Sequence, residues 1–215
     1  MNQYDLLIKN GKVRTAVDSF EAEIGVSEGK ITAIGQNLGK AERTIDAEGM
    51  LVLPGGIDAH CHIEQESSTR IMTADDFYSG SVSAAFGGNT TFLPFAAQHR
   101  GQSLREVVET ARERAQSKAV IDYGLHLIIS DPTQKVLEEE LPSLIKEGYT
   151  SFKVYMTYEM LKINDSEILD ILAIARRYGA LTMVHAENNE VINWISERLL
   201  QRGYHAPKFH AVSHS

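Results

Sequence analysis

Residues 55–64 read GGIDAHCHIE and follow the apolar run LVLP, and this stretch decides the fold. A short apolar run bounded by glycines is typical of a buried strand. Side chains alternate across a strand, so Asp58, His60 and His62 are predicted to share one face while Cys61 points to the other. The two imidazoles therefore converge at the carboxyl end of the strand, where a parallel barrel carries its functional residues.

The spacing of hydrophobic residues changes near residue 51. Residues 1–50 contain short β-like runs separated by Gly, Asn, Asp and Ser, which predicts a small sheet of antiparallel strands and hairpins. Residues 51–215 alternate short apolar runs with stretches of helical period. Repeated strand then helix predicts parallel strands with right-handed crossovers, and hence an α/β sheet or barrel. With roughly 30 residues per unit, this part has room for about five strand–helix units.

The predicted helices carry recognisable end signals. Ser103 and Thr73 precede first turns with acidic residues, as N-caps do. Pro142 lies inside the third helical stretch and predicts a break or a late start there. Four glycines stand where the helical pattern stops, as C-caps do: Gly87, Gly148, Gly179 and Gly203.

Composition and charge narrow the class of protein. Of 215 residues, 43% are hydrophobic and 23% are charged, which is the balance of a soluble globular protein with a sizeable core. The formal net charge of -8 disfavours nucleic acid or anionic lipid as a partner and favours a small, roughly neutral substrate. The start has no basic and apolar leader, and no run approaches a membrane span, so we expect a cytoplasmic protein. The single cysteine, Cys61, cannot form an internal disulfide.

Lys153 lies within the apolar run TSFKVYM, on the same predicted face as Tyr155 and opposite Phe152 and Val154. A plain ammonium there carries a heavy desolvation cost, so this lysine requires a special partner or a changed form. Three interpretations remain open: an ion pair with Asp58, a strand that ends before the lysine and lets it reach solvent, or a neutral amine that takes up carbon dioxide. The resulting carbamate would be an anionic bidentate ligand able to bridge two metals.

A third imidazole follows in LTMVHAEN, where His185 ends another predicted strand. An isolated His-x-His is more often a hydrogen-bonded pair than a metal site, but three imidazoles and a buried lysine together favour a metal. Trp194 has helical spacing with its apolar neighbours, which favours packing. The other histidines have plainer interpretations, with His126 as a hydrogen-bonded core residue, His99 as a solvated loop residue, and His205, His210 and His214 as loop or tail residues.

GGIDAHCH, SFKVYMTY and VHAEN, in this order behind an N-terminal β segment, resemble the cyclic amidohydrolases of the dihydropyrimidinase and hydantoinase family. The resemblance covers essentially the whole chain, and the three motifs together are highly specific. It implies a TIM barrel of the metal-dependent hydrolase type over residues 51–215, with residues 1–50 as the N-terminal part of a small flanking β-sandwich. It also implies two divalent metal ions, usually zinc, bridged by a carboxylated lysine and a hydroxide.

Carried onto this sequence, the resemblance makes His60 and His62 ligands of one metal, Lys153 the N6-carboxylated bridge, and His185 a ligand of the second metal. Tyr158 matches the family tyrosine that donates a hydrogen bond to the carbonyl oxygen as it becomes an oxyanion. The implied reaction is hydrolytic ring opening of a small cyclic amide, a dihydropyrimidine or a hydantoin. The complete protein is expected to be a homo-oligomer.

Five acidic or amide side chains near these positions are weaker candidates. Asp58, Glu64 and Gln65 are expected to support the metal ligands or touch the substrate, and Asp58 matches an inward aspartate of the family. Glu187 and Asn188 follow the third histidine and either orient it or cap the next helix, the cap being the commoner role.

The sequence departs from the family pattern by omission. The family supplies a further metal-binding histidine from the sixth barrel strand and an aspartate from the eighth, and neither is present. The end, GYHAPKFHAVSHS, resembles the family segment after the fifth helix, so we expect a barrel truncated after about five βα units. Two alternatives remain: an allantoinase or dihydroorotase-like hydrolase, which Tyr158 disfavours, and a non-catalytic scaffold relative.

Overall fold

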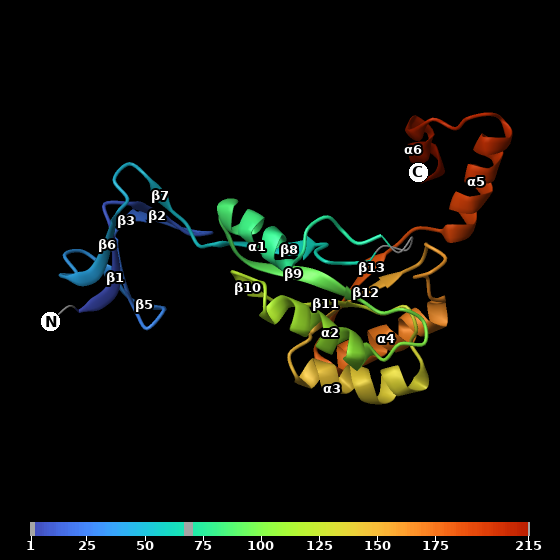
Figure 1. Ribbon diagram of the computed structural model, residues 1–215, viewed down its shortest axis with the longest axis horizontal. Coiled ribbons are helices and arrows are strands. Elements are labelled where there is room, and N and C mark those ends of the chain that lie inside the picture. The colour runs from blue at the N-terminus through green and yellow to red at the C-terminus, as the bar shows by residue number, and fades with distance from the viewer. Residues whose placement is uncertain (1–2, 67–70, 215) are drawn as a thin grey trace. The chain divides into compact units, whose positions relative to one another are not determined.

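The computed structural model describes residues 3–66 and 71–214 and divides the chain into two compact units, Met1–Gly55 and Gly56–Ser215 (Figure 1). We expected the boundary after residue 50, whereas Leu51–Val52 pairs with a strand of the first unit. Within the described ranges, no helix is long and apolar enough to cross a membrane.

The first unit contains two small sheets. The strand order of one is β5-β4-β1-β6, with β5 at Lys30–Gly35, β4 at Glu23–Ser27, β1 at Tyr4–Lys9 and β6 at Ala41–Asp46. The order of the other is β3-β2-β7, with β3 at Ser19–Glu21, β2 at Lys12–Arg14 and β7 at Leu51–Val52. The expected antiparallel pairing holds for β1–β4, β4–β5 and β2–β3. It is wrong for β1–β6 and β2–β7, which are parallel.

A glycine in β4 gives this unit close packing. A Cβ at Gly25 would lie 2.6 Å from the Tyr4 ring, so any larger residue would displace that ring. Leu7, which is opposite Gly25 in the β1–β4 ladder, is fully buried. The assignment of this unit to a β-sandwich stays a prediction.

The second unit is built on a parallel sheet, and its strands keep their chain order. Asp122 is opposite Thr91 and His126 is opposite Phe95, so β10 and β11 continue in one register as a single interrupted strand. β8 pairs with β9, and β9, β11, β12 and β13 follow side by side, all parallel. This is the order of a barrel wall and not of a doubly wound sheet. The strands are β8 (Gly56–Cys61), β9 (Asn89–Ala97), β10 (Asp122–Tyr123), β11 (His126–Ile128), β12 (Ser151–Tyr155) and β13 (Leu181–His185).

Helices connect these strands, and Figure 1 shows α2, α3 and α4 together on one side of the sheet. The helices are α1 (Phe77–Phe86), α2 (Leu104–Gln116), α3 (Leu141–Lys146), α4 (Asp165–Tyr178), α5 (Asn189–Gln201) and α6 (His210–Ser213). A π-helical turn, η1 (Val136–Glu140), runs directly into α3, and a 3₁₀ turn, η2 (Pro207–Phe209), runs into α6.

Local chemistry explains where the helices begin and end. Ser103 caps α2 with its side chain, as predicted. The cap of α1 is Asp76, in a reciprocal capping box, and not Thr73 as expected. Pro142 lies in the first turn of α3 just after the π-helical turn, so the predicted irregularity is confirmed. Gly179 ends α4 in the left-handed conformation, with φ 77°, which glycine adopts without strain.

The two faces of the sheet bury different side chains. One face packs against α2, α3 and α4 in a core that includes Leu104, Leu127, Leu141, Phe152, Val154 and Ile171. The other face carries a smaller cluster of Phe95, Ile128 and Tyr155, with Met183 packed against it. Lys153 alternates with Phe152 and Val154 and so belongs to this second face. The candidate site lies on this second face, toward the carboxyl ends of the strands.

Candidate metal centre

His60 and His62 lie beside one another at the end of β8. Their ring centroids are 5.6 Å apart in an edge-on arrangement, and both rings contact Phe95 of β9, at 4.7 Å and 5.0 Å. The Asp58 carboxylate accepts a hydrogen bond from the His60 backbone N–H at 3.1 Å. The alternation of side chains along β8 therefore brings both imidazoles onto one buried phenylalanine.

Cys61 lies on the other side of β8, where it packs with Ile63, Phe77 and Phe92. Desolvation by burial and the Asp58 carboxylate raise the pKa of the Cys61 thiol to about 11, against a hydrogen bond from the Leu93 backbone. The Cys61 side chain packs among apolar side chains on the side of β8 away from His60 and His62, and burial disfavours its ionised form.

The surroundings of His60 lower its pKa. Desolvation lowers the pKa of His60, and so do the charges of His62, Lys153 and His126, while Asp58 acts in the opposite direction. The rings of His60 and His126 both contact Phe95, at 4.7 Å and 5.1 Å, and Lys153 lies opposite Ile128 of β11. The neutral imidazole that the lowered pKa favours is the form that binds a metal.

Gln65 contacts the second histidine of the pair. The distance from its Oε1 to His62 Nδ1 is 2.7 Å. An amide oxygen only accepts hydrogen bonds, so His62 Nδ1 carries the proton and Nε2 keeps its lone pair. Histidine ligands are commonly oriented by such a contact at the ring nitrogen that is not bound to metal.

Lys153 lies in the middle of β12, which continues to Tyr155, so the interpretation in which the strand ends before Lys153 is wrong. Its Nζ is 5.5 Å from the centroid of the Tyr155 ring. Across residues 3–66 and 71–214, no carboxylate lies within ion-pair distance of Lys153, so the interpretation of a pair with Asp58 is not supported either. The half-buried amine faces imidazoles and aromatic rings.

His185 lies at the end of β13, directly opposite Tyr155 of β12. Its ring stacks on Tyr155 at 5.5 Å and contacts Tyr158 at 5.1 Å. His185 Nε2 is 2.5 Å from a carboxylate oxygen of Glu187, so Nε2–H donates and Nδ1 keeps its lone pair. Glu187 therefore orients His185, while the neighbouring Asn188 caps α5. The sequence left both roles open for this pair of residues.

Tyr158 has an unusual backbone conformation, with φ 69°. Its carbonyl oxygen accepts hydrogen bonds from the backbone N–H groups of Leu161 and Lys162, both at 2.8 Å. Left-handed conformations of bulky residues are strained and persist where the surroundings fix them. The Tyr158 ring is 47% exposed, so its hydroxyl group is accessible to a ligand beside His185.

The predicted ligands do not all come together. In the part of the chain that the structure describes, no three His, Cys, Asp or Glu side chains are close enough to hold a metal ion. His60 and His62 form one pair with Lys153 close by, while His185 is connected to them only through Lys153 and Tyr155. The free lone pairs of His62 and His185 and the lowered pKa of His60 are compatible with metal binding by imidazole.

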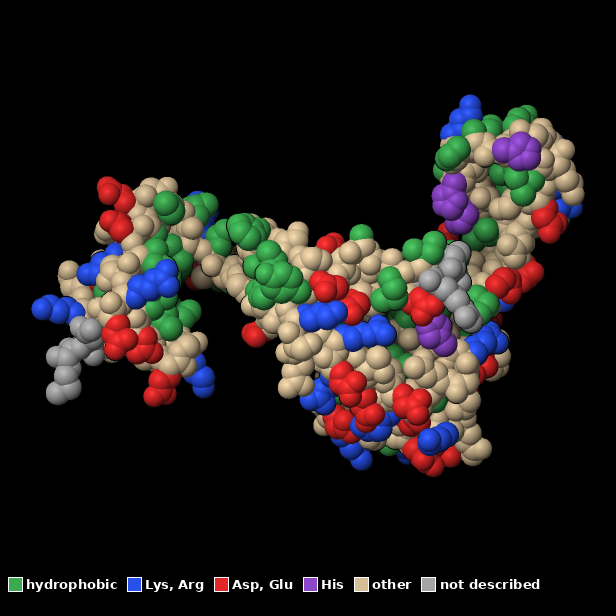
Figure 2. Space-filling model, viewed as in Figure 1, with side chains coloured by type: hydrophobic (Ala, Val, Ile, Leu, Met, Phe, Trp, Pro, Cys, Tyr) green, Lys and Arg blue, Asp and Glu red, His purple; other side chains and the backbone are tan. Residues whose placement is uncertain are grey.

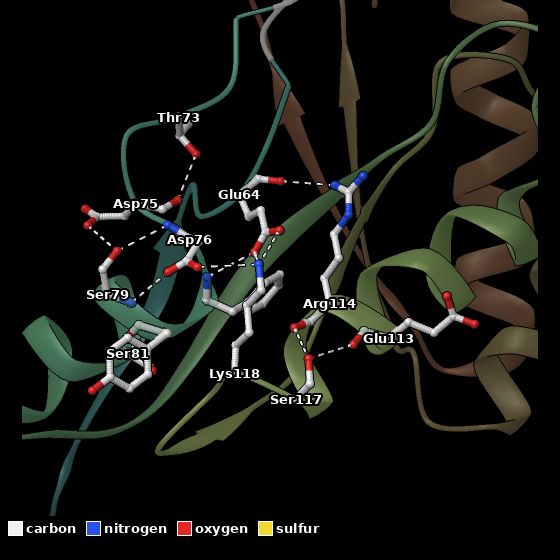
Figure 3. A network of polar contacts seen from close by, with 12 residues as sticks. Glu64, Thr73, Asp75, Asp76, Ser79, Ser81, Glu113, Arg114, Ser117 and Lys118 are labelled. Carbon is white, nitrogen blue, oxygen red and sulfur yellow. Dashed lines mark hydrogen bonds and ion pairs between the residues drawn. The ribbon is translucent and has the colours of Figure 1, made fainter.

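Glu64 does not face the imidazoles. Its carboxylate binds Lys118 and the first backbone N–H of α1 at Phe77 (Figure 3). The proposed contact of Glu64 with the substrate therefore has no support in this structure. The long-range partner, Lys118, lies just beyond the end of α2, and no local sequence pattern identifies it.

The remaining histidines have other surroundings. His126 is buried, with Nδ1 2.5 Å from Ser151 Oγ and Nε2 3.0 Å from the Ala59 carbonyl oxygen, so the predicted hydrogen-bonded core residue is confirmed. His99 is exposed in the turn after β9. Histidine side chains also gather near α6 (Figure 2), where the rings of His210 and His214 are 3.8 Å apart.

Trp194 is 56% exposed, and its packing, which the helical spacing favours over a cofactor contact, is against a neighbouring side chain of the same helix. The Arg198 guanidinium lies over the Trp194 ring at 3.5 Å from its centroid, one turn along α5. Residues four apart on a helix lie on the same face, so the helical spacing places Arg198 over the Trp194 ring in a cation–π contact.

Comparison with known proteins agrees with the three motifs. Residues 51–211 match the amidohydrolase family. The chain is 45% identical to a D-hydantoinase of Geobacillus stearothermophilus over 210 residues, which are 96% of this chain and 44% of that protein. A solved D-hydantoinase structure superposes with a TM-score of 0.94 at 46% identity, over 98% of this chain and 46% of the other. A dihydropyrimidinase structure from Brevibacillus agri NCHU1002 gives 0.92 at 40% identity, over 97% and 46%.

This chain therefore spans about half the length of the proteins that it matches. Over that half, both the sequence and the fold agree, and the parallel sheet corresponds to half of a barrel. Members of the matched family are generally binuclear metal enzymes. The resemblance drawn from the motifs is thus confirmed, and the chain belongs to the amidohydrolase family.

Proposed function

We propose that this chain supplies metal-binding residues of a cyclic amidohydrolase that opens the ring of hydantoins or dihydropyrimidines. The observation that carries the proposal is the gathering of His60, His62 and Lys153 on the face of the sheet that the α2–α4 layer leaves uncovered. The similarity to a D-hydantoinase and a dihydropyrimidinase supports the choice of substrate. Because the chain spans about half of those proteins, the activity is proposed for the whole enzyme, a cytoplasmic homo-oligomer.

The donor set would hold two divalent cations, with zinc as the expected metal. His60 and His62 would bind one cation, His185 would bind the other, and Lys153 would connect the two. His62 presents Nε2 and His185 presents Nδ1, because the other nitrogen of each ring is engaged by Gln65 or Glu187. When bound, such a pair of cations lowers the pKa of a water molecule and polarises the substrate carbonyl.

Lys153 would take part as a carbamate. The lone pair of the neutral amine attacks carbon dioxide, a C–N bond forms, and one proton leaves Nζ. The product carries one negative charge shared between two oxygens, each of which could contact a cation. Lys153 is half-buried and has no carboxylate partner among the described residues, so no ion pair has to be broken to form the carbamate.

Tyr158 would donate its hydroxyl hydrogen to the substrate carbonyl oxygen as negative charge develops there. Its ring lies 5.1 Å from that of His185, and its backbone is fixed by two hydrogen bonds to the carbonyl oxygen. A fixed donor requires no reorganisation during the reaction, which is the property of an oxyanion-stabilising group.

Metal analysis of the 215-residue chain tests the proposal. We expect bound zinc after dialysis of the zinc-loaded chain, and an added carboxyl group on Lys153 by intact mass measured gently in bicarbonate buffer. Lys153→Ala should lose both the added mass and at least one metal. Lys146→Ala is the matched control, because Lys146 lies on α3 beside Tyr178 and should retain both. A chain that binds no metal, or a metal-loaded chain with plain Lys153, would contradict the proposal.

A further inference from the structure

In the loop that follows β8, hydrogen bonds hold both the backbone N–H and the carbonyl oxygen of Gln65. The Gln65 backbone N–H donates to Thr73 Oγ1 at 3.1 Å, and the Thr73 N–H donates to the Gln65 carbonyl oxygen at 3.0 Å. Glu66 and Met72 then pair in an antiparallel bridge. These hydrogen bonds therefore fix the backbone of Gln65, and with it the position from which the Gln65 side chain contacts His62.

On the other side, Glu64 anchors the same loop to two helices. Its side chain is mostly buried, and both carboxylate oxygens contact Lys118 Nζ, at 2.8 Å and 2.9 Å. One of these oxygens also accepts the backbone N–H of Phe77 at the start of α1, at 3.1 Å. The Glu64 carbonyl oxygen accepts from Arg114 of α2 at 3.3 Å, and its N–H donates to the Asp75 carbonyl oxygen at 2.9 Å. Figure 3 shows these contacts converging on Glu64.

The backbone of Glu64 is itself strained, with φ 46°. A non-glycine residue adopts this conformation only where its surroundings compensate, and here five polar contacts surround one residue. A cap for α1 alone would not require them, since Asp76 already caps that helix. The left-handed conformation of Glu64 changes the chain direction between Ile63 and Gln65, and the Gln65 amide then contacts His62 Nδ1.

We propose that Gln65 is a positioning residue that selects the tautomer of His62 with a free Nε2, and that the Glu64–Lys118 pair holds Gln65 in place. The proposal deepens the proposed function and rests on it, because the free Nε2 would be the metal-binding atom. The anchor Glu64 is adjacent in sequence to Gln65 and two residues after His62, but its partner Lys118 is more than fifty residues away.

The tautomer of His62 can be measured without any metal. Long-range proton–nitrogen correlation spectra of the metal-free 215-residue chain distinguish a protonated Nδ1 from a protonated Nε2, and His62→Asn assigns the signal. We expect Nδ1–H in the parent chain and a shift toward Nε2–H in Gln65→Met, which keeps side-chain length but loses the acceptor. Gln65→Glu keeps an acceptor oxygen and should retain Nδ1–H. A parent chain with Nε2–H would mean that the amide nitrogen faces the ring, and the proposal would be wrong.

Zinc affinity, measured by competition with a chelator, is the second readout. We expect Gln65→Met to bind zinc about 10-fold more weakly, which is the lower end of the effect of removing such an orienting partner. Gln65→Glu should restore binding, and Lys118→Met should weaken it. Lys146→Met, on α3 beside Tyr178, is the control and should not change it. Equal affinity in Gln65→Met and Gln65→Glu would overturn the proposal.

The two readouts separate this inference from the function on which it rests. A chain that binds no zinc at all contradicts the proposed function, yet the spectra of the metal-free chain still show whether Gln65 selects the tautomer. A chain that binds zinc equally well with and without the Gln65 acceptor leaves the proposed function standing and removes the role of Gln65.

Discussion

Replacing His126 with phenylalanine should destabilise the second unit and weaken the metal site together. His126 is 6% exposed, and its ring bridges two strands through Ala59 of β8 and Ser151 of β12. Phenylalanine keeps the ring volume and the contact with Phe95, whose centroid is 5.1 Å away, so only the hydrogen bonds are lost. The Ala59 carbonyl immediately precedes His60, which means that the loss of this bond loosens the strand that presents the histidines.

The magnitude follows from the two bonds. Each neutral hydrogen bond contributes about 0.5–1.5 kcal/mol net, so the free energy of unfolding should fall by about 1–3 kcal/mol. Urea titration followed by circular dichroism measures this change, and zinc competition measures the effect on the site. Ser151→Ala is the control, because it removes one bond and should show about half the loss. A change below about 0.5 kcal/mol in His126→Phe, or an equal loss in Ser151→Ala, would refute the reasoning.

Three further predictions concern the site, the core and the assembly state. In the active enzyme, Tyr158→Phe should lower turnover by about 10²- to 10³-fold with unchanged metal content, since only the oxyanion donor is lost, whereas Tyr155→Phe should not. Glu140→Gln should lower the free energy of unfolding near pH 7. Desolvation by burial raises the pKa of the Glu140 carboxyl group, but hydrogen bonds from Ser103, the Leu104 backbone and Lys135 outweigh it and hold this pKa below its ordinary value. Its contribution is therefore present above the unfolded pKa and lost as pH falls through the folded pKa, so urea titrations of the two proteins should converge in acid. Finally, the 215-residue chain alone should associate, because β8 and β13 each have one unpaired edge within the part of the chain that the structure describes. It should also show no ring opening of dihydrouracil or hydantoin with added zinc, because the described residues contain no group of three metal-ligand side chains. Size-exclusion chromatography and an activity assay test this, and robust turnover by a monodisperse chain would contradict it.

Much of the second unit could be predicted because its signals are local. The alternation of apolar runs and helical stretches gave the parallel strands in chain order, and residue parity put His60 and His62 on one face. Two features could not be predicted from local patterns: the interruption between β10 and β11, and the π-helical turn before α3. Both depend on packing against neighbouring strands and helices. In the first unit, the parallel pairs β1–β6 and β2–β7 join segments far apart in sequence, and hairpin signals do not report them.

The candidate site was predictable where the residue type itself is unusual, and less so where its partner is distant. Lys153 stood out because an ammonium in an apolar strand is costly. The position of Glu64 directly after the histidines predicts a contact with the substrate, but its carboxylate instead binds Lys118. The roles of Phe95 and Tyr155 as the aromatic surface under the imidazoles depend on strand register, which only the structure gives.

Cys61 gives the protein a built-in reporter of how the histidine-bearing strand moves. It is the only cysteine of the chain, and its thiol lies between His60 and His62 in sequence but on the buried side of β8. Burial raises the pKa of this thiol to about 11, so a reagent that reacts with the thiolate should label it slowly near neutral pH. The rate of labelling would then count the openings of β8, and a cation held by the two histidines on its other side should slow that rate.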